Sequence, residues 1–183
     1  RQRQMCIRDS LNIKRIIEFE VYFMEFVQPI RDLKKIETIK KLLKQQSLRD
    51  YCLFVIGINS GLRISDLLKL TISDVLDGNK LKDRIRLREK KTNKFKDFPL
   101  SDKSKSALKE YLKTREYKEN EPLFISRKNK GFLLRQQAYK IINNVAHEVG
   151  IKEKIGTHTL RKTFGYHAYK NLSLIHISEP TRH

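Results

Sequence analysis

The sequence is poor in several residue types that mark other classes of protein. It contains two cysteines, Cys6 and Cys52, which are too few for a disulfide framework and lack the spacing of metal ligands. It has no run of about 18 apolar residues, so no segment is predicted to span a membrane. No apolar stretch follows Arg1 and Arg3, so no secretory signal is expected. Its 7 glycines and 4 prolines form no linker and no repeat occurs, so one domain is expected.

Acidic residues are also scarce. The 183 residues include 21 Asp and Glu against 40 Lys and Arg, which gives a net charge of +19. This length allows one domain with a buried core, and a hydrophobic content of 39% argues against disorder. A positive surplus of this size indicates a polyanionic partner, most commonly nucleic acid. We therefore expect a cytoplasmic domain that binds nucleic acid, with no membrane and no small-molecule substrate as partners.

The two ends of the chain are related in a way that natural genes have no reason to show. Residues 5–10 can be encoded by ATGTGTATAAGAGACAG and one further base, and the reverse complement of this string encodes residues 172–176 and opens the next codon. The string resembles the transposase adapter of sequencing libraries. We therefore expect residues 1–10 and 172–183 to be translated adapter.

The rest of the chain keeps the basic character. Residues 1–10 carry three arginines and one aspartate, and 172–183 carry one residue of each sign, so residues 11–171 still hold +17. Residues 11–23 change apolar period midway and precede Met24, so they are either upstream DNA read through or genuine protein. The genuine domain is therefore expected over residues 24–171.

Apolar periodicity predicts a mainly helical fold with one small β-hairpin. Helices are expected to start near Asp32, Ser47, Ser65, Ser101, Leu134 and His158. The helix after Ser47 is apolar on every side, which places residues 51–58 at the centre of the fold. In residues 84–88 and 94–96 the period changes to two, as in a half-buried hairpin with a lysine-rich tip. The expected fold class is mainly α with a small antiparallel β-sheet (α+β).

Local signals set the expected helix ends and buried faces. Ser47 with Asp50 resembles a capping box, a short helix is expected from Ser65 to Leu70, and Gly61 and Gly150 are expected to end two helices. The last helix is expected to run from His158 to Asn171. The expected buried faces are Leu33, Ile36, Ile39 and Leu43; Ala107, Leu108, Tyr111 and Leu112; Leu134, Ala138, Ile141, Ile142, Val145 and Val149; and Leu160, Phe164 and Ala168.

Three short motifs stand out along the chain. Residues 59–68 read Asn-Ser-Gly-Leu-Arg-Ile-Ser-Asp-Leu-Leu, residues 88–94 read Arg-Glu-Lys-Lys-Thr-Asn-Lys, and residues 156–164 read Gly-Thr-His-Thr-Leu-Arg-Lys-Thr-Phe. His158 and Arg161 are three residues apart on an expected helix, so they share one face and can reach one ligand. Any one of these motifs alone is common by chance, whereas three in order are not.

Together the motifs resemble the catalytic domain of the tyrosine recombinase (phage integrase) family over residues 29–171. They correspond to its Gly-Leu-Arg box, its hairpin Lys-Thr-Gly with Asn93 in place of the glycine, and its His-x-x-Arg helix. The resemblance implies that fold, and DNA strand cleavage and rejoining through a phosphotyrosine intermediate on double-stranded DNA. It also implies a homotetramer on DNA, a nucleoid-associated location in the cytoplasm of a prokaryotic or phage host, and no cofactor.

The chemistry of phosphoryl transfer favours the same residues. A scissile phosphodiester gains charge on its non-bridging oxygens during transfer, so fixed cations must lie there. Arginine suits this because its planar group donates in pairs to phosphate and stays charged. Arg63 and Arg161 are therefore the expected clamp, and Asp66 is expected to orient Arg63 or the fold around it. The alternative is that Arg63 and Asp66 form a plain ion pair.

Lys91 and His158 take their expected catalytic roles from the resemblance. Lys91 would protonate the 5′-hydroxyl leaving group, and His158 would bind the phosphate or move the nucleophile's proton. Each also has a simpler interpretation, Lys91 as one more phosphate contact and His158 as a helix cap. His147 and His167 are expected to be structural, and no metal site is expected because no pair of ligands has a zinc-site spacing. The other expected DNA contacts are Lys90, Lys94, Lys96 and Lys162.

The nucleophilic tyrosine of the family is expected to lie beyond the genuine part of this chain. In the family it stands well downstream of the His-x-x-Arg arginine, and only ten genuine residues follow Arg161 here. Tyr166 and Tyr169 share the helix of Arg161 and are not expected to attack. The family's N-terminal DNA-clamping domain is also absent from residues 24–171.

This chain is therefore expected to bind DNA without cleaving it, whereas the intact protein would be a recombinase. Two other classes remain open at this point. One is a non-catalytic DNA-binding protein on the same fold, and the other is an RNA-binding basic domain, which fits the charge alone.

Overall fold

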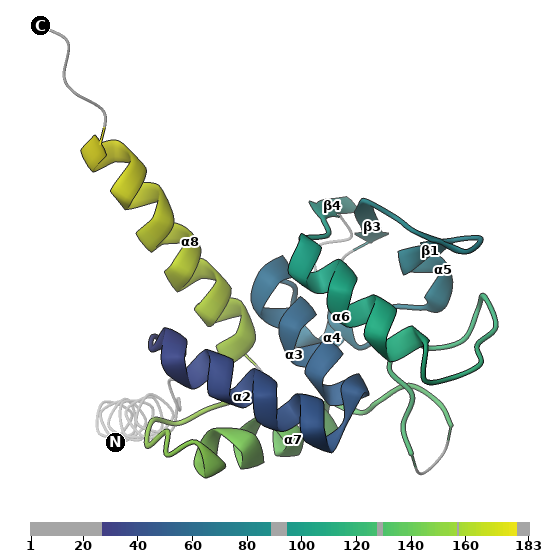
Figure 1. Ribbon diagram of the computed structural model, residues 1–183, viewed down its shortest axis with the longest axis horizontal. Helices are drawn as coiled ribbons and strands as arrows, with labels where there is room; N and C mark the ends of the chain where they lie inside the picture. The colour runs from purple at the N-terminus through teal and green to yellow at the C-terminus, as the bar shows by residue number, and fades with distance from the viewer. Residues whose placement is uncertain (1–26, 89–94, 128–129, 157, 179–183) are drawn as a thin grey trace, which may run out of the picture.

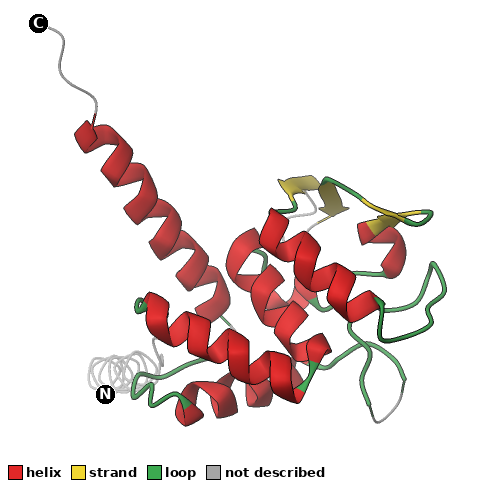
Figure 2. Cartoon of the chain, viewed as in Figure 1, coloured by secondary structure: helices red, strands yellow, loops and turns green. Residues whose placement is uncertain are grey.

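Helices form most of the chain that the computed structural model describes, which is residues 27–88, 95–127, 130–156 and 158–178, with side chains up to Asn171 except that of Lys96 (Figure 1). The strands are short and gather on one side (Figure 2). The predicted class, mainly α with small antiparallel sheets, is confirmed. The elements are α2 Leu33–Gln46, α3 Leu48–Ser60, α4 Ile64–Leu67, α5 Ile72–Val75, β1 Leu76–Asp77, β2 Lys80–Leu81, β3 Arg84–Arg88, β4 Phe95–Pro99, α6 Asp102–Leu112, α7 Arg135–Glu148 and α8 Thr159–Ser178.

The predicted caps at Asp32 and Ser101 are confirmed. Asp32 Oδ1 accepts the N–H of Lys34 at 2.8 Å, and the Ser101 hydroxyl accepts the N–H of Ser104 at 3.3 Å. Each bond satisfies a donor that the first turn of the helix leaves without an intrahelical partner. The two side chains therefore fix where α2 and α6 begin.

The predicted capping box at the start of α3 forms only in part. The Ser47 hydroxyl accepts the N–H of Asp50 at 3.5 Å, as predicted. The Ser47 N–H, however, donates to the carbonyl of Leu43 at 2.8 Å, so the Asp50 carboxylate does not receive it. Asp50 instead accepts from the Arg49 guanidinium at 2.7 Å. The tight junction between α2 and α3 supplies the acceptor that the box would otherwise provide.

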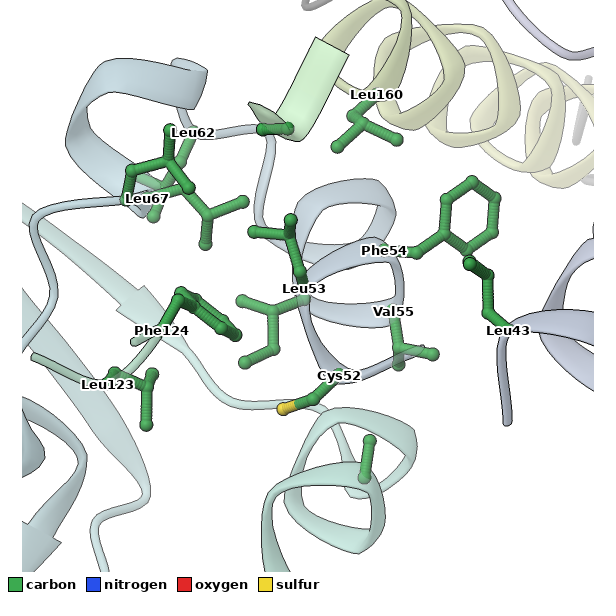
Figure 3. Packing of buried hydrophobic residues seen from close by; sticks show 14 of the residues in the cluster. Leu43, Cys52, Leu53, Phe54, Val55, Leu62, Leu67, Leu123, Phe124 and Leu160 are labelled. Atoms are coloured by element: carbon green, nitrogen blue, oxygen red, sulfur yellow. The ribbon is translucent and has the colours of Figure 1, made fainter. Parts of the chain in front are cut away.

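Helix α3 lies at the centre of the fold, as its apolar surface predicts. It packs against α2, α6 and α8. Every residue from Cys52 to Gly57 is buried. Figure 3 shows Phe54 of α3 beside Leu43 of α2, with Leu160 of α8 near the same helix. A helix without a polar face must be covered on all sides, and burial of each large apolar side chain contributes about 1.5–3 kcal/mol.

Two leucines predicted to be buried are exposed. Leu33 is 64% exposed and Leu134 is 54% exposed. Leu33 is the first residue of α2, and Leu134 is the N-cap of α7. Both stand before the first full turn, where the chain has not yet aligned with the face that packs on the core. The following apolar positions are buried as predicted in both helices: Ile36, Ile39 and Leu43, and Ala138, Ile142 and Val145.

The strands form two antiparallel sheets. Strands β3 and β4 pair from Arg84↔Pro99 to Arg88↔Phe95, which confirms the predicted hairpin. Ile85 is buried while Arg84, Arg86 and Arg88 are exposed, so the basic residues form its outer face as predicted. The second sheet, β1–β2, was not predicted, because two-residue strands are too short to show an alternating pattern.

Helix α8 crosses the end of α3 and then leaves the body of the molecule (Figure 1). A Cβ atom at Gly57 would lie 2.5 Å from Leu160 Cδ1, and one at Gly61 would lie 2.5 Å from Phe164 Cδ1. Gly61 also has φ of +62°, as predicted for the residue that ends α3. The two glycines therefore let the first turns of α8 approach α3 closely.

The predicted buried face of α8 is wrong beyond its first turn. Leu160 is buried as predicted, but the other covered residues are Thr159 and Thr163, whereas Phe164 is exposed and Ala168 is only half-buried. The helix projects away from the core, so the apolar stripe soon has nothing to pack against. It also continues to Ser178, beyond the predicted end at Asn171.

Candidate active site

Arg63 stands at the start of α4, directly after the bend that Gly61 makes possible. Arg63 is the N-cap of α4 and is half-buried. The helix itself runs from Ile64 to Leu67 and is shorter than the predicted span to Leu70. The close contact of Gly61 with Phe164 brings this bend against α8.

Asp66 lies one turn beyond Arg63 and is 6% exposed. Its Oδ1 accepts a hydrogen bond from the Ser65 hydroxyl at 3.4 Å. Its Oδ2 is buried and has no hydrogen-bond partner among the described residues. A buried carboxylate beside an arginine is suited to orient that arginine, so the predicted role of Asp66 remains a prediction with a suitable location.

His158 and Arg161 lie together at the beginning of α8. The carbonyl of His158 accepts the N–H of Lys162 at 3.0 Å, which makes His158 the residue that opens the helix. The Gly156 N–H donates to the Thr159 hydroxyl at 3.0 Å and fixes the chain just before it. Arg161 follows within the first turn, where its side chain is half-buried and its Nη1 is a buried atom without a hydrogen-bond partner in the described part of the chain.

The electrostatics of His158 connect the first motif with the third. Burial lowers the pKa of His158, and the positive charges of nearby residues lower it further. In decreasing order of effect the cations are Arg135, Lys162, Arg161 and Arg63. Arg63 is 95 positions away in sequence, so only the fold can bring its charge to His158. The first and third motifs therefore lie near each other, and burial together with the four cations favours the neutral form of the imidazole.

The second motif lies mostly outside the described residues. Lys90, Lys91 and Lys94 fall in the range 89–94, and only the backbone of Lys96 is described, in β4. Their predicted roles therefore stay predictions.

Strand β3, which leads to this motif, does lie beside α4. A cavity of about 290 Å³ is lined by Asp66 and Lys69 on one side and by Arg86, Leu87 and Arg88 of β3 on the other. The end of β3 nearest the hairpin turn is therefore next to the helix that Arg63 begins.

Residues 27–31, which we call the N-terminal strap, tie α8 in place. Ile30 donates its N–H to the Thr163 hydroxyl at 2.9 Å, and its carbonyl bonds to His167 Nε2 at 3.0 Å. Lys162 Nζ donates to the carbonyl of Val27 at 2.8 Å. Three side chains of α8 thus hold the backbone of the strap. The contact agrees with the structural role predicted for His167, and it gives Lys162 a partner besides the predicted DNA.

Sequence reasoning missed the contribution of α7. A groove of about 450 Å³ beside His158 is lined by Val27, Arg135, Gln136, Tyr139, Lys140, Gly156 and His158. Arg135 has the largest electrostatic effect on His158 of any charged residue. It is also the first residue of α7, where a positive charge is unfavourable to the helix dipole. That unfavourable position is the signal by which Arg135 could have been found, because it suggests an anionic ligand nearby.

No three metal-ligating side chains cluster within the described residues. No helix in the described part of the chain is long and apolar enough to cross a membrane.

The arrangement of these motifs agrees with comparisons to known proteins. The model of the phage integrase family matches residues 31–176. The chain belongs to the phage integrase family. It is 46% identical over 147 residues to the probable integrase/recombinase YoeC of Bacillus subtilis, covering 80% of this chain and 77% of YoeC.

Solved structures share the fold. The XerA recombinase matches with a TM-score of 0.66 at 21% identity, over 80% of this chain and 52% of that one. The XerH site-specific recombinase, bound to a palindromic difH substrate in a post-cleavage complex, matches with a TM-score of 0.63 at 25% identity, over 84% of this chain and 46% of that one. The chain therefore carries a recombinase domain and spans about half the length of these two solved chains.

Proposed function

We propose that this chain is the catalytic domain of a site-specific DNA recombinase and that Arg63, His158 and Arg161 hold one phosphodiester of double-stranded DNA. The observation that carries the proposal is the effect of Arg63 on His158 across 95 positions of sequence. A protein that only binds DNA has no need to gather these residues at one point. The DNA-bound state of the XerH structure, a protein of the same fold, supports DNA as the partner.

Each of these side chains suits a separate part of strand transfer. The two guanidinium groups can donate to the non-bridging oxygens, where negative charge grows in the transition state. Arg161 Nη1 is already desolvated, so it can donate to a phosphate without first losing a bond to the described protein. His158 has a lowered pKa and is neutral at pH 7, so its imidazole can accept the proton of an attacking hydroxyl or donate its own N–H.

The proposed reaction is a balanced exchange of phosphodiester bonds. A tyrosine hydroxyl attacks the phosphorus and loses its proton, for which His158 is the proposed acceptor. A 3′-phosphotyrosyl bond forms, and the bond to the 5′-oxygen breaks. The departing 5′-oxygen takes a proton, for which Lys91 is the proposed donor. A 5′-hydroxyl from a second strand reverses these steps. Because one ester replaces another at each step, the exchange needs no external energy source.

We propose that neither described tyrosine of α8 is the nucleophile. Tyr166 is five residues from Arg161, which places it about 140° around the helix. The centre of its ring lies 5.8 Å from the guanidinium carbon of Arg31 and 5.7 Å from Lys170 Nζ. Tyr169 is eight residues on, about 12 Å further along the axis, and is 74% exposed. On this proposal the chain itself binds DNA without cutting it, and the intact protein assembles as a homotetramer on nucleoid DNA.

The proposal is tested by measuring binding and nicking of a labelled mixed-sequence duplex in parallel. We expect wild-type protein to bind and not to nick. Arg161→Ala should weaken binding about 10-fold, because it removes a charged donor at the phosphate. Arg127→Ala removes an exposed arginine outside the candidate site and should change affinity less than about twofold. Equal effects of the two substitutions, or nicking that survives Arg63→Ala, would contradict the proposal.

A further inference from the structure

A lysine-rimmed groove lies on elements that carry none of the candidate site residues. It has a volume of about 590 Å³ and runs between α6 and the β1–β2 hairpin. In Figure 1 α6, β1 and α5 lie to one side of α3, and α8 leaves on the other. The lining residues are Leu76, Asn79, Lys80, Leu81, Lys105, Lys109, Leu112, Lys113 and Tyr117. The volume is in the range that holds a small ligand or a few side chains.

The floor of this groove is apolar. Leu76 and Leu112 belong to the core and expose only their edges, and Leu81 packs against that core. Tyr117 is 38% exposed and adds an aromatic ring. A short apolar side chain that enters the groove would therefore be removed from water on several sides, which gives the groove an anchor point.

The rim is positive, and three of its four lysines have no acidic partner among the described residues. No acidic side chain lines the groove. Lys105 pairs with Asp83, but the ammonium groups of Lys80, Lys109 and Lys113 have no hydrogen bond or ion pair with the residues that the structure describes. Lys109 and Lys113 are four residues apart on α6, so both stand on the same side of the groove. Three such cations around an apolar floor are complementary to an anionic partner that carries an apolar side chain.

The far end of the groove limits the length of that partner. The neighbouring hollow shares Leu76, Asn79 and Tyr117 with the groove but is also lined by Asp77 and Glu119. A continuous polyanion such as DNA would have to pass these carboxylates after leaving the lysines. Double-stranded DNA also offers no side chain for the apolar floor. A short acidic peptide segment meets neither difficulty.

We propose that this groove is a docking site for a short acidic segment of a partner protein, with one large apolar side chain of the segment seated on Tyr117 and the leucines. The site is separate from the DNA-binding surface proposed above and does not depend on it. Protein partner and DNA can then occupy the domain at the same time.

The chain has no tryptophan, which allows a direct test. A short synthetic peptide of Glu and Asp around one central Trp is titrated with the protein, and Trp emission is recorded. We expect saturable binding with a shift of the emission to shorter wavelength, because the indole leaves water. The same peptide with Gln and Asn in place of the acidic residues should not bind.

Two matched double variants separate this groove from the general positive charge. Lys109→Glu with Lys113→Glu should weaken peptide binding by about 10-fold or more, since it replaces two positive charges of the rim with negative ones. Lys34→Glu with Lys41→Glu changes the net charge equally at exposed positions of α2 and should have less than about a twofold effect. Tyr117→Ala should weaken binding severalfold and remove most of the emission shift.

Three results would overturn the proposal. Equal losses of peptide affinity in the two double lysine variants would show that net charge alone attracts the peptide. Displacement of the peptide by duplex DNA would make the groove part of the nucleic-acid surface. A failure of the peptide to bind, with the protein forming dimers through the groove, would assign it to a second copy of the chain. The first and third outcomes are measured without DNA, so they do not depend on the catalytic proposal.

Discussion

His158 is exposed, yet its surroundings hold it in the neutral form. Partial burial and four cations lower its pKa, and those cations come from α7, α8 and the start of α4. In the free protein this cluster of cations is unfavourable, because the positive charges repel one another. The arrangement becomes favourable when a phosphate enters, since each cation then gains a partner.

Removal of one of these cations should be visible at His158. In Arg63→Ala the pKa of His158 should rise toward its ordinary value, because one repulsive positive charge is lost. Histidine ring NMR over a pH series measures the change. Arg127→Ala is the control and should leave the titration of His158 as it is in the wild-type protein. Identical titrations in wild-type and Arg63→Ala protein would show that the two residues do not share a site.

At the scale of elements, the junction of α3, α4 and α8 decides whether the site forms. Gly57 and Gly61 allow Leu160 and Phe164 to approach, and the N-terminal strap holds α8 from the other direction. None of these contacts is local in sequence. They join a helix in the first third of the chain to one near its end.

Substitution of Gly61 tests the close approach of α8. Gly61→Ala should lower the free energy of unfolding by about 2–4 kcal/mol, because a methyl group adds both positive-φ strain and a clash with Phe164. Gly78 also has positive φ, but open space surrounds it. Gly78→Ala should therefore lower the free energy of unfolding by only about 1–2 kcal/mol. Urea denaturation measures both values, and equal losses would mean that the helices are not in tight contact.

The strap can be tested through the Thr163 hydroxyl. Thr163→Val keeps the shape of the side chain but leaves the buried N–H of Ile30 without its acceptor, so it should cost about 1–3 kcal/mol of unfolding free energy. Thr163→Ser keeps the acceptor and should cost clearly less. If the two variants unfold alike, the hydrogen bond to Ile30 is not what holds the strap.

Helix starts and the central helix could be predicted because their signals are local. Asp32, Ser47 and Ser101 cap within their own first turns, and the uniform apolar surface of α3 requires burial wherever it packs. The β1–β2 sheet and the exposed Phe164 could not be predicted in this way. Two-residue strands leave no period, and whether a stripe on α8 is covered depends on where the helix points.

At the scale of the whole molecule, the proposed site combines residues that sequence motifs mark with others that they do not. The motifs predict Arg63, His158 and Arg161, whereas Arg135 and Lys140 stand on α7 with no motif of their own. Their proximity to His158 follows from the packing of α7, which no periodic pattern specifies. Lys91, the proposed proton donor, lies outside the described residues.

The salt dependence of DNA binding should reflect these gathered charges. Arg63 and Arg161 are proposed to hold one phosphate, and Arg135, Lys140 and Lys162 lie at or beside His158, so about four phosphate contacts are expected. The logarithm of the association constant should then fall with the logarithm of salt concentration with a slope of about −3 to −4. Fluorescence anisotropy with a labelled duplex measures it. A slope near −1 would mean that most of these cations do not meet the DNA backbone.

Titration of His158 with and without duplex DNA tests whether Arg63, His158 and Arg161 surround a DNA phosphate. A bound phosphate places negative charge beside the imidazole and offsets the cations that now lower its pKa. We expect saturating DNA to raise the pKa of His158, with a smaller rise in Arg161→Ala. An unchanged His158 titration in fully bound protein would place the DNA elsewhere.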